Sequence, residues 1–337
     1  MQLRFFVGCA HFAIGCGLLS NARVFPKPQF VSSNGIRMAV YEEGAGPAVI
    51  MVHGFPELAY SWRHQIPALA NAGFRAIAPD MRGYGRSDAP EGVDQYGVKK
   101  LIGDLLGLLD ALTIERATFV GHDWGALILW HMAMRVPDRI DRLIALNIPH
   151  YPRPPIDPIQ VFRQKFGDDF YIVNFQDSDA ADKAFASDPG HLFDMMMRKN
   201  QVSRAQFDEF PPQMKVLSLL RLMRRSQSSG EPLLTDEERS YYVNAFSKSG
   251  FTGPINWYRN WTHNWQELEG ADPIITIPTL FIGAVDDMII APEHIEAMKP
   301  LLTNLTIEML EPCGHWTQQE RPDDVNRLII RWLTGFT

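Results

Sequence analysis

The sequence predicts an α/β fold in which a mostly parallel, doubly wound sheet carries an inserted helical segment. Short apolar runs that suit buried strands alternate with amphipathic helical runs over 26–148 and again over 265–337. Over 149–264 such strands give way to proline clusters and to helical patterns rich in Met, Arg and aromatic residues. Strand–helix alternation implies a parallel sheet covered by helices on both faces. We therefore expect a core of 26–148 and 265–337 and a helical cap of 149–264.

The elements of the core follow from local patterns. Strands are predicted where short apolar runs are bounded by turn residues, at 48–53, 75–79, 117–121, 140–147, 279–283 and 306–310. Helices are predicted where apolar residues recur at a spacing of three and four, at 101–112, 126–135 and 323–333. Pro137 closes the second of these helices.

Composition excludes several classes of protein. The chain has 337 residues, of which 46% are hydrophobic and 21% charged, so it can bury a large core. Its net charge of −7 provides no basic surface for nucleic acid, and no nucleic-acid partner is expected. The 3 cysteines offer no disulfide framework, which favours the cytoplasm without excluding export.

The first 25 residues carry an ambiguous targeting signal. Arg4 precedes an uncharged run over 5–19, and the small residues Ser20 and Ala22 follow. This layout resembles a signal peptide, whereas the run is short for a membrane span. A peripheral anchor and a dispensable extension are the alternatives. Membrane contact is expected only through 1–25.

The motif Gly-His-Asp-Trp-Gly at 121–125 lies between a predicted strand and a predicted helix. This context is the nucleophile elbow of an α/β-hydrolase, whose middle residue is the nucleophile. That residue is usually serine, which attacks acyl carbonyls, but here it is Asp123. A carboxylate instead displaces a leaving group at a saturated carbon and forms an alkyl ester. Asp123 therefore argues against an esterase or peptidase and predicts epoxide opening or halide removal.

The other members of a hydrolase triad have candidates at the expected strand ends. In this fold the acid and then the histidine follow the nucleophile along the chain. His315 comes just after the last predicted strand, and Asp286 and Asp287 both follow the strand before it. Counting from Gly283 favours Asp286, and the residues alone leave this choice open. His122 is interpreted as structural because it should point away from the pocket.

These residues predict a reaction in two steps. Asp123 attacks the substrate and becomes an ester, and His315 then deprotonates a water that attacks the ester carbonyl. Because the tetrahedral intermediate forms on Asp123, an oxyanion hole must face that carboxyl. Its expected donors are the backbone N–H groups of Trp124 and of Phe55, in the turn after the strand at 48–53. No metal or nucleotide motif occurs, and neither a metal nor another cofactor is expected.

Three motifs carry a specific resemblance to a known family. His-Gly-Phe-Pro-Glu at 53–57, the elbow at 121–125 and Cys-Gly-His-Trp-Thr at 313–317 together resemble the soluble epoxide hydrolases of the α/β-hydrolase fold. The similarity covers about 25–333 and includes the cap, where 170–176 and 256–260 resemble the segments that bear the family's two cap tyrosines. The resemblance implies conversion of an epoxide and water to a vicinal diol, a chemistry of detoxification.

The resemblance also implies roles for three residues. The family's cap tyrosines fall on Tyr171 and Tyr258. Ring opening turns the epoxide oxygen into an alkoxide, and two phenols of pKa about 10 can hydrogen-bond this oxygen and deliver a proton. The family pattern also places a proline five residues after the acid, which Pro292 satisfies for Asp287. Asp287 is therefore the expected acid and Asp286 the second choice.

The expected partner is a small apolar epoxide. Aromatic side chains near the motifs predict an apolar pocket, formed beside Phe55 and Trp124 by Pro56, Phe175, Trp257 and Trp316. Lipid, terpene and aryl epoxides all fit such a pocket, and the chain can be a monomer or a homodimer.

Two other functions are alternatives to epoxide hydrolysis. A haloalkane dehalogenase shares the Asp nucleophile, but it needs halide-binding donors and usually has Asn or Glu where Phe55 stands. A non-catalytic ligand-binding protein of the same fold is the second alternative, since fold alone does not define function. A decayed site should lack a triad member or a cap tyrosine, and neither is missing here.

Overall fold

The computed structural model describes residues 25–177, 179–199 and 202–335. Most of the predicted targeting segment, 1–24, therefore lies outside the described residues. An eight-stranded sheet has the order β1-β2-β4-β3-β5-β6-β7-β8. Its strands are β1 (Gln29–Ser33), β2 (Ile36–Glu43), β3 (Ala48–Val52), β4 (Arg75–Pro79), β5 (Ala117–His122), β6 (Ile140–Leu146), β7 (Thr279–Ala284) and β8 (Leu305–Leu310). Strands β3 to β8 pair in parallel, and the expected mostly parallel sheet is confirmed.

The antiparallel edge of the sheet was not anticipated from the sequence. β1 and β2 form a hairpin in which Ser33 pairs with Ile36, and β2 pairs antiparallel with β4. Asn34 and Gly35 form its two-residue turn, with φ of 47° and 78°. β1 is largely exposed and has no apolar run, so its pairing with β2 determines its conformation. The Asn-Gly pair was the available signal for this hairpin.

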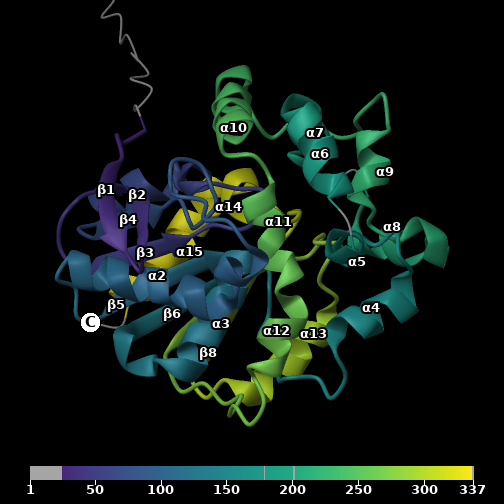
Figure 1. The fold of residues 1–337 in the computed structure, drawn as a ribbon. Coiled ribbons are helices and arrows are strands. Elements are labelled where there is room, and N and C mark those ends of the chain that lie inside the picture. Colours follow the sequence, from purple (N-terminus) through teal and green to yellow (C-terminus); the bar gives the residue numbers. More distant parts are fainter. Residues whose placement is uncertain (1–24, 178, 200–201, 336–337) are drawn as a thin grey trace, which may run out of the picture.

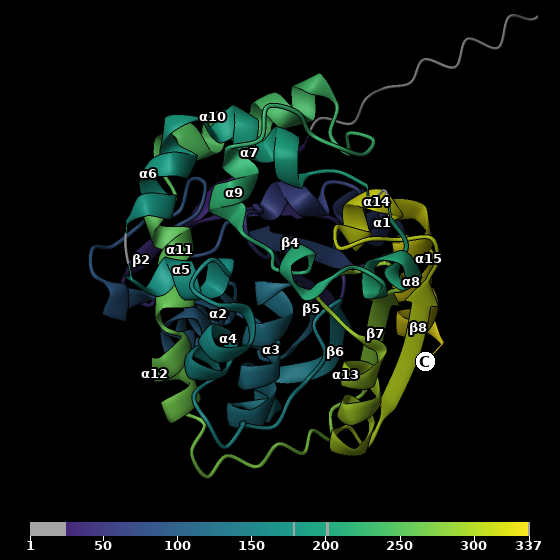
Figure 2. The same ribbon diagram turned by 90° about the vertical axis from the view of Figure 1, so that its right-hand side faces the viewer.

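Helices cover both faces of the sheet (Figure 2). α1 (Gln65–Asn71) packs with α15 (Pro322–Thr334) on one face, and α2 (Val98–Ala111) packs with α3 (Trp124–Arg135) on the other. Alternate residues of β3 serve the two faces, because successive side chains of a strand point in opposite directions. Val49 belongs to the cluster with α1 and α15, and Ile50 to the cluster with α2 and α3. This double burial defines the doubly wound core.

Between β6 and β7 the chain forms a run of helices, here called the helical insertion (Figure 1). Its helices are α4 (Pro158–Phe166), α5 (Tyr171–Asp177), α6 (Ala180–Ser187), α7 (Pro189–Met196), α8 (Arg204–Asp208), α9 (Leu219–Met223), α10 (Asp236–Ser249), α11 (Thr252–Arg259) and α12 (Trp261–Gln266). They gather on one side of the α/β core in Figure 1. The insertion shares an apolar cluster with α2 and α3, so it is packed onto the core.

Short elements complete the structure. Two further helices, α13 (Pro292–Met298) and α14 (Thr317–Glu320), follow β7 and β8. The 3₁₀ turns are η1 (Ala59–Trp62), η2 (Val93–Tyr96), η3 (Pro137–Arg139), η4 (Pro212–Met214) and η5 (Lys299–Leu301). No helix in the described part of the chain is long and apolar enough to span a bilayer.

Candidate active site

Asp123 lies at a sharp turn between β5 and α3. Its φ is 53°, in the left-handed region that non-glycine residues seldom adopt. The flanking glycines are sterically required, because a Cβ on Gly121 would lie 2.5 Å from the carbonyl carbon of Gly125, and one on Gly125 would lie 2.0 Å from the Val52 oxygen. The turn leaves the Asp123 carboxylate at the N-terminus of α3, where the helix dipole favours negative charge. Trp124 begins this helix, and the role of its N–H as an oxyanion donor stays a prediction.

The turn after β3 contacts the Asp123 carboxylate directly. The Phe55 N–H donates to Asp123 Oδ1 at 2.9 Å, where the sequence predicts an oxyanion donor. A Cβ on Gly54 would lie 2.5 Å from this same oxygen, so the contact requires glycine. His53 holds the turn: its Nε2 accepts the Met81 N–H at 3.0 Å and its Nδ1 donates to the Gly54 carbonyl at 2.9 Å. Burial lowers the pKa of His53 to about 4, which keeps the ring neutral.

His315 lies between two carboxylates. Its Nδ1 is 2.9 Å from Asp287 Oδ2, and its Nε2 is 3.7 Å from Asp123 Oδ2. Burial by itself would lower the pKa of His315, but the charges of the two aspartates and the hydrogen bond to Asp287 outweigh it and raise the pKa well above its usual value. With both carboxylates ionised, His315 is therefore an imidazolium.

The structure separates the two aspartates that follow β7. Asp287 is 1% exposed, and its two oxygens accept the Ile289 N–H at 2.9 Å and Asn147 Nδ2 at 2.7 Å. Burial pushes the pKa of Asp287 up, but the charge of the neighbouring imidazolium and these hydrogen bonds hold it below its usual range. Asp286 accepts the backbone N–H of Arg204 at the start of α8, at 3.0 Å. Asp287 is thus the aspartate of the pair that contacts the histidine.

Tyr171 and Tyr258 come from two helices of the insertion and meet at the site. Tyr171 begins α5 and Tyr258 lies in α11, and their ring centroids are 5.6 Å apart. Gln176 Nε2 donates to the Tyr258 carbonyl at 2.9 Å and ties the two helices together. Burial raises the pKa of both phenols, and the charge of Asp123 raises it further. Both tyrosines therefore keep their protons at neutral pH.

Aromatic rings surround the two tyrosines. The Tyr258 ring centroid lies 5.2 Å from Phe55, 5.0 Å from Trp124 and 5.1 Å from Phe175. Phe55 is also 5.9 Å from Phe175. These residues form one continuous apolar cluster between the core and the insertion.

Three further predicted pocket residues have structural contacts as well. The Trp257 indole N–H donates to the Arg82 carbonyl at 3.2 Å, and Trp257 is fully buried. The Trp316 indole N–H donates to the Met196 carbonyl of the insertion at 2.8 Å. Pro56 is buried directly after Phe55. The roles of Pro56, Trp257 and Trp316 in lining the substrate pocket stay predictions.

A buried contact between Glu57 and His122, next to the site, was not predicted from the sequence. Glu57 Oε2 is 2.8 Å from His122 Nδ1, and His122 Nε2 is 2.7 Å from the His315 carbonyl. The two ring nitrogens of His122 thus contact a carboxylate oxygen on one side and a backbone carbonyl on the other. Glu57 also accepts the Gly54 N–H at 2.9 Å. The Glu57–His122 pair therefore links the turn after β3, the elbow and the loop that bears His315. Glu57 within the motif at 53–57 was the available signal.

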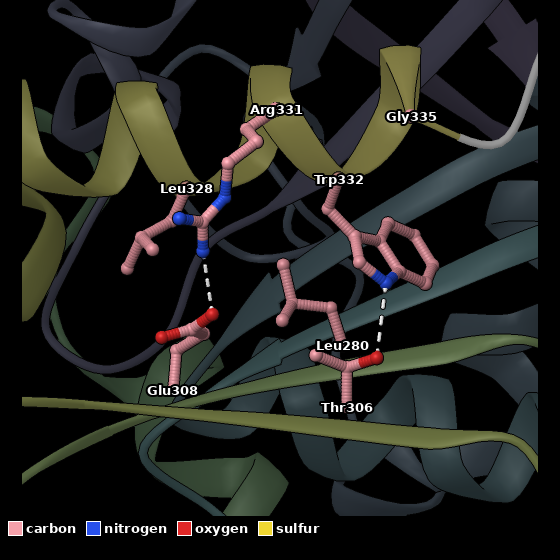
Figure 3. A pocket seen from close by; sticks show the side chains of 7 residues that line it. All are labelled: Leu280, Thr306, Glu308, Leu328, Arg331, Trp332 and Gly335. Carbon is pink, nitrogen blue, oxygen red and sulfur yellow. Dashed lines mark hydrogen bonds and ion pairs between the residues drawn. The ribbon is translucent and has the colours of Figure 1, made fainter.

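Two surface hollows lie away from these residues. One of about 220 Å³ is formed by β7, β8 and α15 (Figure 3). Arg331 pairs with Glu308 across it at 2.5 Å, and the Trp332 indole N–H donates to Thr306 Oγ1 at 3.3 Å. The other, of about 360 Å³, is lined by residues of α6, α7 and α9. Neither hollow includes a residue that contacts Asp123 or His315.

Comparison with known proteins covers nearly the whole chain. A family model described as alpha/beta hydrolase fold matches residues 47–322. The chain is similar to Epoxide hydrolase A of Mycobacterium tuberculosis, with 39% identity over 92% of this chain and 98% of that protein. It is 37% identical to Bifunctional epoxide hydrolase 2 of Sus scrofa over 94% of this chain, and it spans 55% of that longer protein. The crystal structure of Epoxide Hydrolase A from Mycobacterium thermoresistibile has a TM-score of 0.84 at 38% identity, covering 92% of this chain and 98% of its own.

The elbow, the histidine between two aspartates and the paired tyrosines occur in one site, as the resemblance implies. Because identity with these relatives extends through both the core and the insertion, this chain belongs to the epoxide hydrolase family of the α/β-hydrolase fold.

Proposed function

We propose that the protein hydrolyses a small apolar epoxide to a vicinal diol through a covalent ester on Asp123. The observation that carries this proposal is the pair of buried phenols, Tyr171 and Tyr258, whose pKa values are raised by burial and further by the nearby charge of Asp123. An epoxide bound between the Asp123 carboxylate and these two protonated phenols would have the nucleophile on one side and the proton donors on the other. The family membership and the names of the relatives support the same reaction.

The first step opens the ring. Asp123 Oδ2 attacks an epoxide carbon while Oδ1 remains hydrogen-bonded to the Phe55 N–H. The carbon–oxygen bond of the ring breaks, and one tyrosine gives its proton to the leaving oxygen. General acid catalysis of this kind contributes about 10²–10⁴-fold. The products of the step are a hydroxyalkyl ester and a tyrosinate.

Esterification changes the charge around His315. Before the step, two carboxylates hold the His315 imidazolium, and the ester removes the negative charge of Asp123. The pKa of His315 then falls, because one of the charges that raised it is gone. The imidazolium can now release its proton, by way of solvent, to restore the tyrosine. His315 is left neutral and able to act as a base.

The second step hydrolyses the ester. Neutral His315 takes a proton from water, and the resulting hydroxide attacks Cγ of Asp123. Negative charge develops on Oδ1, where the Phe55 N–H already donates, and Asp287 stabilises the imidazolium that forms. When the intermediate collapses, the bond between Cγ and the substrate oxygen breaks, and the proton of the added hydroxyl passes to that oxygen, which releases the diol and restores the Asp123 carboxylate. Protons balance over the cycle, since the proton taken from water returns His315 to its starting form.

A haloalkane dehalogenase is the alternative that the test must exclude. Purified protein and an Asp123→Ala variant are assayed for diol formation from styrene oxide and epoxy fatty acid esters, and for halide release from 1-bromobutane. Diol formation that the variant lacks supports the proposal. Halide release without diol would identify a dehalogenase, and the absence of both activities would favour a binding role.

A single-turnover reaction in ¹⁸O-water tests the covalent ester. With enzyme in excess over epoxide, the ester mechanism places the heavy isotope in the Asp123 carboxyl and leaves the first diol unlabelled. Direct attack of water on the epoxide would label the diol instead, and mass spectrometry of the diol and of the Asp123 peptide separates the two mechanisms.

A further inference from the structure

Asn147 directly follows β6 and is held in place by its backbone. Its N–H donates to the carbonyl of Ile282 in β7 at 3.0 Å. Its φ of 68° lies in the left-handed region, which asparagine tolerates better than most residues. The residue is 1% exposed. Because β7 neighbours β6 in the sheet, the Asn147 side chain can reach the loop after β7, where Asp287 stands.

The Asn147 amide contacts the same oxygen of Asp287 that holds His315. Its Nδ2 is 2.7 Å from Asp287 Oδ2, and His315 Nδ1 is 2.9 Å from that oxygen. A carboxylate only accepts hydrogen bonds, so the nitrogen of the amide must face it. The amide oxygen is buried and has no hydrogen-bond partner among the described residues. An unpaired buried acceptor is unfavourable for stability, so the contact with Asp287 is the evident use of this side chain.

Two donors that share one oxygen affect each other. The positive end of the Asn147 amide dipole lies beside the imidazolium, and the amide takes part of the electron density of Asp287 Oδ2. Both effects weaken the attraction between Asp287 and a proton on His315. The hydrogen bonds to Asp287 Oδ2 also hold the carboxylate in one orientation, in which its Oδ1 accepts the Ile289 N–H at 2.9 Å.

We propose that Asn147 is a positioning residue, which orients Asp287 and limits how tightly Asp287 retains the proton on His315. The inference rests on the proposed function, because His315 must lose this proton before it can act as a base on the ester. Too strong an Asp287–His315 pair would keep the histidine charged and stop the second step. Asn147 thus acts through Asp287 and needs no contact with the substrate.

Other titratable groups also act on this pair, and the test must hold them constant. His315 faces Asp123 on the elbow, and the His122 ring lies 5.0 Å from it. Asp287 exerts its charge on Tyr151, Tyr171 and Cys313. Arg204 of the insertion reaches the Asp287 carbonyl at 3.4 Å. Substitution of Asn147 leaves the identities of all these groups unchanged.

Two variants separate the side chain of Asn147 from its backbone conformation. Asn147→Gly removes the amide and keeps a residue that adopts positive φ freely. Asn147→Asp retains the shape but places a second carboxylate against Asp287. Asn34→Gly is the matched control, because Asn34 also has positive φ, 47°, and its amide donates to Asp104 at 2.9 Å, outside the site. Stopped-flow single turnovers with styrene oxide from pH 5 to 9 give the ester hydrolysis rate, and thermal unfolding gives the stability.

The wild-type hydrolysis rate should rise with pH as His315 loses its proton. In Asn147→Gly this rise should move to higher pH by about half a unit, and in Asn147→Asp by about one unit or more, since a like charge is added. On the acidic side of the rise, a half-unit shift slows hydrolysis about threefold. Esterification should change less than hydrolysis in both variants. Asn34→Gly should lose stability without moving the pH profile.

The outcomes distinguish this inference from the proposed function. An unmoved or lowered pH profile in Asn147→Gly, with wild-type hydrolysis intact, would overturn the inference alone and leave Asn147 a structural residue. If both Asn147 variants fail to fold while Asn34→Gly folds, the residue is a requirement of the fold and the inference is again wrong. If the wild-type protein forms no ester, the proposed function fails and the inference falls with it.

Discussion

The tight contact between Gly54 and Asp123 offers a direct test of the site. Ordinary van der Waals contact begins at 3.4 Å, and the Cβ of a Gly54→Ala variant would lie 2.5 Å from both Cβ and Oδ1 of Asp123. These atoms must separate by about 0.9 Å, the difference between the two distances. Asp123 cannot yield easily, because its own Cβ is part of the clash and its backbone is held in the elbow.

The expected consequence is a loss of rate in a protein that still folds. A misplacement of about 1 Å at a reacting group can cost about 10²-fold, and loss of one oxyanion donor costs about 10²–10³-fold. Movement of the turn would also displace the Phe55 N–H, which donates to Asp123 Oδ1. We therefore expect kcat of Gly54→Ala to fall by about 10²–10³-fold. Both ester formation and ester hydrolysis should slow, because both use this carboxylate.

Gly97→Ala is the control for this experiment. Its added Cβ would meet no atom closer than 3.4 Å, and the φ of Gly97 is −63°, which alanine adopts readily. The control should retain kcat within about twofold, as expected for a substitution without strain. Diol formation is measured at steady state, ester accumulation by rapid quench and mass spectrometry, and folding by circular dichroism. A folded Gly54→Ala protein with nearly wild-type kcat would refute the assigned role of the turn after β3, in which Gly54 and Phe55 contact Asp123.

Three further predictions concern the tyrosines, the aspartates and a buried histidine. Replacement of Tyr171 and Tyr258 together by Phe should lower the rate of ester formation by at least about 10²-fold; rapid-quench rates near wild type would contradict their role as proton donors. Asp287→Ala should slow ester hydrolysis more than Asp286→Ala, because Asp287 contacts His315, and the reverse ranking in single turnovers would show that the acid is wrongly assigned. Burial, and to a smaller extent the nearby charges of an arginine and a second histidine, lower the pKa of His131 from 6.5 to about 3. Below pH 6.5 the unfolded chain therefore binds a proton at this histidine that the folded chain does not bind. At pH 5 this difference lowers the free energy of unfolding by about 2 kcal/mol. His131→Leu should gain about this much stability at pH 5 relative to pH 8 in urea unfolding, and parallel pH dependences of the two proteins would contradict the low pKa.

The elements of the core could be predicted because their signals are local. Apolar runs marked β3 to β8, and each predicted strand agrees with the structure to within one residue at either end. The hairpin of β1 and β2 was missed because β1 has little apolar surface of its own and depends on its partner strand. The elbow could be predicted for the opposite reason, since its glycines and Asp123 are adjacent in the chain and their steric requirement is local.

The contacts within the site could be predicted only in part. The sequence indicated that His315 and an aspartate should follow neighbouring strands, but the residues alone did not choose between Asp286 and Asp287. The structure distinguishes the two, because Asp287 contacts His315, whereas Asp286 accepts a backbone N–H at the start of α8. The resemblance to the family selected the same aspartate through Pro292. The catalytic roles themselves, and the lining of the pocket, stay predictions for the experiments above.

The sequence by itself determined the chemical groups of this protein and their order along the chain. A carboxylate in the elbow, a histidine after the last strand and two tyrosines in the insertion already indicated an epoxide hydrolase. Tertiary structure decided which groups touch, such as Asn147 with Asp287 and Glu57 with His122, pairs that lie 140 and 65 residues apart in the chain. The physical reason is that such contacts arise from the order of strands in the sheet and from burial, which requires polar groups to form hydrogen bonds with one another. No local pattern of residues determines either the strand order or the burial.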